Sequence, residues 1–326
     1  MLDTGTRDKD VKKRDRWKLG RTMHIADKVF PNLTLFFALV IVAILLGLVT
    51  VLTTDALPAI RQFGFSFLSS SIWDPVKEIF GALPAIYGTV LSSVIAMIIA
   101  VPVSFGAAIF LVELAPSWLS RPASFIIEML AAIPSVIIGL WGLFVLVPAI
   151  KPVEIWLSKN AGFLPVFHGT VLSGLSFLSA GLILTFMTVP IITAVSRDAI
   201  KAVPNTQREA MLALGATRWE MIRKAVLPYC RSGLVGGIIL GLGRALGETM
   251  AVTMVIGNSY KLTASLFSPG TTIASKIASE FGEASSGVFV SSLIELALIL
   301  FIVTLLVNVI ARVLLWRMTS VKMINE

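Results

Sequence analysis

Six long apolar segments dominate the sequence and leave few folds open to it. They run from Leu33 to Leu52, Pro84 to Leu111, Phe125 to Val147, Val171 to Val195, Ser232 to Ile256 and Val288 to Arg312. A helix needs about 20 apolar residues to cross the hydrocarbon core of a bilayer. Because 56% of the residues are hydrophobic and only 14% are charged, the chain is too apolar for a soluble domain of this length. The sequence therefore predicts an all-α polytopic membrane protein with about six transmembrane helices.

The distribution of Lys and Arg predicts the orientation of these helices. Segments 1–32, 112–124, 196–231 and 312–326 carry 20 of the 27 basic residues, whereas segments 53–83, 149–170 and 257–287 carry 6. Cytoplasmic loops are enriched in Lys and Arg, so we expect both termini in the cytoplasm. The first apolar segment follows a long basic flank and exceeds the h-region of a signal peptide, so we expect it to remain as an anchor.

This topology divides the chain into three parts. They are a basic cytoplasmic arm (1–32), a transmembrane domain (33–312) with a cytoplasmic loop at 196–231, and a cytoplasmic tail (313–326). The cytoplasmic basic residues explain the net charge of +8, so no nucleic acid is expected as a partner. The basic cluster from Lys9 to Arg21 suits anionic membrane lipid, and a protein partner for it is an open alternative.

Residues 206–228 form a polar island with strong helix signals. Two capping boxes, Thr206 with Glu209 and Thr217 with Glu220, flank Gly215. In such a box a hydroxyl and a carboxylate three residues apart satisfy the free N–H groups of a helix start. Gly215 suits a left-handed C-cap, and Pro228 is expected to end the second helix. The island therefore predicts two helices joined at a glycine, which we call the elbow.

Several kinds of site are absent from the sequence. There is no G-x-x-x-x-G-K-[ST] motif for nucleotide phosphates, no H-E-x-x-H and no G-x-S-x-G elbow. One cysteine, Cys230, and two histidines exclude a disulfide framework and a dedicated Cys/His metal site. We expect no catalytic residue, metal or cofactor in this chain. If ATP drives its function, another subunit must bind the ATP.

The fifth apolar segment contains a pair of charges among close-packing glycines. Gly233, Gly237 and Gly241 share one helix face and Gly243 and Gly247 another, which predicts close approach of neighbouring helices on more than one side. Arg244 and Glu248 lie one turn apart near the middle of the segment. A charge at that depth costs roughly 2.5–3.5 kcal/mol and usually faces a bundle interior or an aqueous path.

Two roles are open for Arg244 and Glu248. In one, they form a structural ion pair within the helix bundle. In the other, the Arg244 guanidinium lines the translocation path and meets an anion, since its planar fork of donors matches an oxyanion. Glu248 would then keep the anion from binding too tightly. The two roles differ in whether Arg244→Lys is tolerated.

The elbow resembles the EAA loop of the membrane subunits of binding-protein-dependent ABC importers. The matching positions are Glu209, Ala210, Gly215, Leu227 and Pro228, while Met211 and Ala225 depart from the pattern. The resemblance implies a type I ABC importer permease bundle in which the elbow docks on an ATPase subunit. It makes Met211 and Ala225 partner-specific contacts. The alternative is an amphipathic hairpin that lies on the membrane surface, anchored by Trp219.

A narrower resemblance covers nearly all of the chain from the first span to the last. Segments 131–143, 189–200 and 241–254 are similar to the phosphate-specific ABC permeases of the PstC type. The resemblance implies import of phosphate across the bacterial inner membrane and maps the arginine and glutamate implicated in phosphate passage onto Arg244 and Glu248. It implies a second, PstA-like permease, a PstB-like ATPase dimer and an extracytoplasmic, PstS-like phosphate-binding protein as partners.

Rival functions remain open at this stage. An importer of another oxyanion, such as molybdate or sulfate, would have the same architecture. An ion-coupled secondary transporter would use Arg244 and Glu248 as a proton relay, and the lack of an inverted repeat argues against it. A membrane enzyme is disfavoured because no catalytic set is present.

Overall fold

The computed structural model describes residues 5–169, 171 and 173–320, and side chains within 29–313 of that range. Its helices are α1 (Gly5–Phe63), α2 (Ser66–Ser69), α3 (Leu83–Ile109), α4 (Ser117–Ala131), α5 (Ser135–Trp141), α6 (Val147–Ala161), α7 (Phe177–Lys201), α8 (Asn205–Ala213), α9 (Arg218–Met221), α10 (Leu227–Gly247), α11 (Met250–Val255), α12 (Ile273–Glu280) and α13 (Gly287–Ser320). Apart from one isolated bridge between Asp74 and Ile79, the described residues form no β structure. The predicted all-α class is confirmed.

Three of these helices continue through wider π-helical turns. The turns are η1 (Phe110–Leu114), η2 (Gly142–Leu146) and η3 (Ile222–Val226). The latter two lie directly before Pro148 and Pro228, which stand near the first position of α6 and α10. A proline lacks an N–H and clashes with a carbonyl of the preceding turn, and a π turn accommodates such an interruption without ending the helix.

Six helices in the described part of the chain are long and apolar enough to cross a membrane. They are Val29–Phe63, Leu83–Leu114, Ser135–Ala161, Phe177–Lys201, Arg218–Gly247 and Gly287–Val313. The predicted number is confirmed, and the first, second and sixth predicted segments coincide with a span. The fourth begins six residues later than predicted, at Phe177, where Ser176 accepts a hydrogen bond from the Ser179 N–H as N-cap.

The third predicted segment was placed wrongly. Phe125 to Val147 is not one helix, because α4 ends at Ala131 and a new helix starts after Pro134. Pro134 has extended backbone (ψ 136°) and cannot donate to a preceding helical turn. The span therefore runs from Ser135 to Ala161, and α4 is a separate 15-residue helix.

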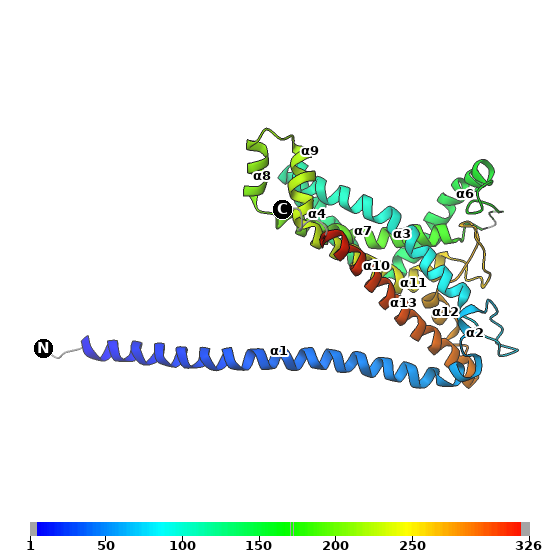
Figure 1. Cartoon of the computed structure of the whole chain (residues 1–326), viewed down its shortest axis with the longest axis horizontal. Coiled ribbons are helices and arrows are strands. Elements are labelled where there is room, and N and C mark those ends of the chain that lie inside the picture. Colours follow the sequence, from blue (N-terminus) through cyan, green and yellow to red (C-terminus); the bar gives the residue numbers. More distant parts are fainter. Residues whose placement is uncertain (1–4, 170, 172, 321–326) are drawn as a thin grey trace. The chain divides into compact units, whose positions relative to one another are not determined.

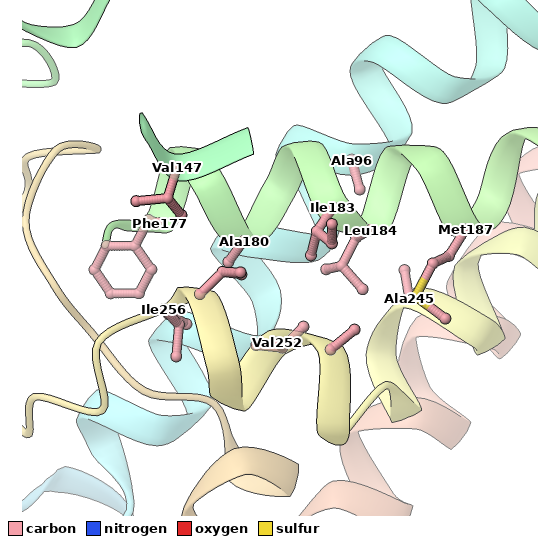
Figure 2. Packing of buried hydrophobic residues seen from close by; sticks show 12 residues of the cluster. Ala96, Val147, Phe177, Ala180, Ile183, Leu184, Met187, Ala245, Val252 and Ile256 are labelled. Atoms are coloured by element: carbon pink, nitrogen blue, oxygen red, sulfur yellow. The ribbon is translucent and has the colours of Figure 1, made fainter. Parts of the chain in front are cut away.

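The chain divides into two compact units, residues 1–54 and 55–326. The first consists of α1 up to Thr54. In the second, α7 is the most buried span, with 61% of its central window inside the protein. It packs along α3 and α10, and α10 also packs on α13 (Figure 1). The main core cluster surrounds α7, and Figure 2 shows Ala180, Leu184 and Met187 facing Ile256, Val252 and Ala245.

Glycines permit the close packing of α10 on α7. A Cβ at Gly233 would lie 2.4 Å from the Cβ of Ala199, and one at Gly241 would lie 2.6 Å from the side chain of Ile192. Gly237 is the third member of this face, 3.3 Å from the Ser196 hydroxyl. The predicted close approach is confirmed for this face. Gly243 and Gly247 have open space beside them, so no described residue of this chain packs on the second face, and close approach there stays a prediction.

Candidate functional site: the elbow and the Arg244/Glu248 pair

The elbow links α7 to α10 through two short helices, α8 and α9, which lie beside each other (Figure 1). Gly215 joins them with φ +81°. The Gly215 N–H donates to the carbonyl of Leu212 (3.0 Å) and the Ala216 N–H to that of Met211 (3.2 Å), which is the hydrogen-bond pattern of a Schellman C-cap. The predicted left-handed glycine is therefore confirmed.

The two predicted capping boxes have different outcomes. Thr217 caps α9: its hydroxyl accepts from the Glu220 N–H, and its own N–H donates to the Glu220 carboxylate. The first box was predicted wrongly, because Pro204 is the N-cap and α8 already begins at Asn205. Thr206 therefore lies inside the first turn, where its hydroxyl does not cap the helix.

The prediction that Pro228 ends the second helix was also wrong. The helical path runs from α9 through η3 into α10, and Pro228 is the second residue of α10. The π turn just before the proline absorbs the interruption. As a result the second half of the elbow is continuous with a transmembrane span.

The five residues predicted to couple this chain to an ATPase differ in burial. Glu209, Ala210 and Gly215 are exposed, whereas Leu227 and Pro228 are half-buried. Leu227 packs against a cluster at the base of the elbow, which we call the hinge cluster, and Met211 packs against it too. Met211 is half-buried there, and its predicted contact with a partner stays a prediction.

The hinge cluster is apolar and joins the elbow to three spans. It combines the end of α3, the end of α7 and the start of α10, through Ala108, Ile200, Val203, Met221, Ile222, Val226, Cys230 and Leu234. Exposed apolar side chains lie farther out on the elbow, with Leu214 85% and Trp219 61% accessible. Both side chains are available for contact with a partner surface or with the membrane interface.

Two ion pairs at this end of the bundle were not predicted from the sequence. Arg208 of α8 pairs with Glu113 of η1 at 2.8 Å, with side chains 15% and 6% exposed. Arg197 of α7 pairs with Glu128 of α4 at 2.7 Å and with its neighbour Asp198 at 2.9 Å. Arg208 precedes the motif residue Glu209, but its partner lies 95 positions away, which no local pattern reveals.

The predicted Arg244/Glu248 pair exists, but in a different setting. Arg244 Nη2 lies 3.5 Å from Glu248 Oε2, and the side chains are 40% and 5% exposed. However, α10 ends at Gly247, and Glu248 has extended backbone (ψ 127°). The predicted continuous span to Ile256 is therefore wrong, and the pair lies at a helix break rather than in the middle of a helix.

The break is stabilised by burial of the next helix. Ala251, Val252 and Val255 of α11 are buried in the core cluster around α7. The Glu248 carboxylate also accepts a long hydrogen bond (3.4 Å) from the N–H of Ala251, in the first turn of α11. A carboxylate at a helix N-terminus is favoured by the unpaired N–H groups there. Glu248 is thereby fixed, and the half-exposed Arg244 is held at the same break.

Among the described residues, no group of three or more His, Cys, Asp and Glu side chains is placed to hold a metal ion. The two candidate regions are the exposed elbow and the charge pair at the helix break. Residues 100–320 match the sequence model of a protein family described as binding-protein-dependent transport system inner membrane component. The chain belongs to this family of membrane permeases. It is accordingly a multi-pass inner-membrane transport subunit.

Several curated proteins are similar to this chain over almost their full length. The phosphate transport system permease protein PstC of Haemophilus influenzae is 48% identical over 91% of this chain and 95% of its own. The protein of that name from Pasteurella multocida is 51% identical over 90% and 93%, and that from Mesorhizobium japonicum is 45% identical over 92% and 93%. The resemblance to the PstC type is thus confirmed.

A solved structure supports the fold of the permease. A chain of the MetNI methionine ABC transporter, in an inward facing conformation, matches with a TM-score of 0.50 at 18% sequence identity. The match covers 74% of this chain and 94% of that chain. The predicted ABC importer permease bundle is confirmed as a fold.

Proposed function

We propose that this permease imports inorganic phosphate across the bacterial inner membrane. The observation that carries the proposal is the similarity to three PstC permeases at 45–51% identity over about nine-tenths of each chain. With this observation, phosphate is favoured over molybdate or sulfate, and an ATP-driven importer over an ion-coupled secondary transporter.

The proposed assembly contains the partners that such an importer needs. A second, PstA-like permease completes the path, and an extracytoplasmic phosphate-binding protein delivers the anion. A separate ATPase dimer hydrolyses ATP, since the chain has no nucleotide-binding motif. Both termini, the arm 1–32 and the tail 313–326, lie in the cytoplasm with the elbow, and residues 33–312 form the transmembrane domain. The counts of basic residues on the loops support this orientation.

The elbow is the proposed ATPase contact. Glu209, Ala210 and Gly215 are exposed on it together with Leu214 and Trp219, so a groove on the ATPase would bury apolar and charged atoms together. Leu227 and Pro228 lie at the base of the elbow, where it becomes α10, and would pass its displacement to that helix. Closure of the ATPase dimer would displace the elbow and change the tilt of the spans, opening the path alternately to each side.

Arg244 is the proposed phosphate contact on the path. Its side chain is 40% exposed, so its planar fork of donors is open to an oxyanion. Burial and the helix N-terminus hold Glu248 in place, so it acts as a fixed negative charge 3.5 Å from the guanidinium. A fixed anion beside the arginine weakens its hold on phosphate, so that phosphate leaves as well as enters.

Uptake by cells tests the proposal. The complete transporter is expressed in cells that lack their own phosphate importers, and uptake of labelled phosphate is measured with unlabelled phosphate, sulfate or molybdate as competitor. Only unlabelled phosphate is expected to compete at equal concentration. Competition by sulfate or molybdate as strong as by phosphate would refute phosphate as the substrate.

A further inference from the structure

Arg208 is the most connected side chain of the elbow. Its Nε and Nη2 atoms donate to Glu113 Oε1 at 3.0 and 2.8 Å. Nη2 also donates to the Ile200 carbonyl at 2.9 Å, and Nη1 donates to the Val203 carbonyl and to Asn205 Oδ1. One guanidinium therefore joins α8 to the carboxylate that follows α3 and to the last turn of α7.

Burial makes these contacts mutually dependent. The Arg208 side chain is 15% exposed and that of Glu113 only 6%, so neither charge is well solvated without the other. The contacts also need a planar fork of donors, because the guanidinium donates at once to the Glu113 carboxylate and to two backbone carbonyls. A lysine ammonium at this position has one nitrogen and cannot reach a carboxylate and the carbonyls together.

The chain path shows why such a link matters on this side of the elbow. The second half of the elbow runs without a break into α10 through η3. The first half has no such continuity, because α7 ends at Lys201 and α8 starts at Asn205. Between them lies a short non-helical link, residues 202–204, which includes the Val203 carbonyl that Arg208 binds. Backbone alone thus couples α8 only loosely to α7, and it does not couple α8 to α3.

We propose that Arg208 and Glu113 form a tether that transmits displacement of α8 to α3 and α7. The two residues are positioning residues: they contact neither phosphate nor nucleotide, and they act through the helices they join. Since α3 and α7 pack against each other and α7 packs against α10, the tether and η3 together move the helices of the core as one group. This inference rests on the proposed function of the elbow as the ATPase contact.

The test measures coupling rather than activity alone. The wild-type complex with its ATPase, Arg208→Lys, Glu113→Gln and the double variant are reconstituted in liposomes, and phosphate uptake and ATP hydrolysis are measured in the same preparation. Lys77→Gln is the control, because it removes an exposed ion pair with Asp74 far along the sequence from the elbow. The amount of ATPase that co-purifies with each variant is determined as well.

The tether predicts a fall in phosphate imported per ATP hydrolysed by about tenfold in each single variant, within the usual range of coupling between sites. ATP hydrolysis and co-purification should stay near wild type. The double variant should be no worse than either single variant, because both remove one interaction. Lys77→Gln should have the wild-type ratio.

Other outcomes overturn the inference. A wild-type ratio in both single variants would show that no tether is needed. A parallel fall of uptake and hydrolysis, or loss of the ATPase from the purified complex, would make Arg208 a folding or docking residue. If the wild-type complex itself shows no ATP-dependent uptake, the proposed function fails and not the tether alone.

Discussion

Gly215→Ala tests whether the elbow depends on a left-handed residue. Gly215 has φ +81°, and a Cβ added there would meet nothing within 4 Å. Within this chain the cost is therefore conformational: about 1–2 kcal/mol for an L-residue in this region. The lower entropy of the unfolded alanine chain offsets about 0.4–1 kcal/mol of it. The net expectation is a local destabilisation of the elbow by about 1 kcal/mol.

Gly236→Ala is the matched control. Gly236 lies inside α10 and also has nothing within 4 Å of its Cβ position. At a helical position, replacement of glycine by alanine is favourable by about 0.8–1.0 kcal/mol. Replacement of glycine by alanine should thus lower stability at Gly215 and raise it at Gly236.

Amide hydrogen exchange of the assembled complex measures this difference locally. A cost of about 1 kcal/mol raises the open population of the elbow by about fivefold, so amides of α8 and α9 should exchange about fivefold faster in Gly215→Ala. In Gly236→Ala they should exchange as in wild type. Equal exchange in the two variants, or unchanged exchange in Gly215→Ala, would refute the assignment of a left-handed cap to Gly215.

Three further predictions concern packing, the charge pair and the buried Lys276. Gly88→Ala should destabilise the fold by about 1–3 kcal/mol or more, because its Cβ would lie 1.9 Å from the Thr271 carbonyl oxygen, whereas Gly106→Ala in the same helix has open space and should be neutral or stabilising in thermal unfolding. Arg244→Lys should lower phosphate uptake by about tenfold, since an ammonium lacks the planar fork for an oxyanion; uptake at the wild-type rate would make the pair structural. Burial lowers the pKa of Lys276, and Glu280 opposes this shift only in part. The unfolded chain then binds more protons between the lowered pKa and about 10.4, so stability contributed by this group rises with pH there and is lost as pH falls through the lowered value. The melting temperature of wild type relative to Lys276→Met should therefore increase as the pH rises toward about 10.4, and a constant difference would contradict the shift.

Local chemistry explains what could be predicted from the sequence. Long apolar runs require transmembrane helices, and a glycine followed by Thr217 and Glu220 is enough for a C-cap and a new helix start. The four-residue spacing of Gly233, Gly237 and Gly241 predicts a close-packed face, which α7 occupies. These features depend on residues close together in the chain.

Features that depend on distant residues could not be predicted. The break after Gly247 exists because α11 is buried against α7, although residues 241–254 have the composition of one helix. The helix passes Pro228 because the preceding turn is π-helical, which sequence does not indicate. Arg208 and Glu113 are 95 residues apart, and only the packing of α3 on α7 and the start of α8 beside them brings the charges together.

The central claim is that ATP hydrolysis outside this chain drives phosphate through it. The most direct measurement is uptake of labelled phosphate into liposomes that contain the complete complex, with the binding protein on the outer side and ATP enclosed on the elbow side. We expect phosphate to accumulate only when ATP is present. Its uptake should continue when an ionophore abolishes the ion gradients. Uptake without ATP that stops on addition of the ionophore would contradict the claim.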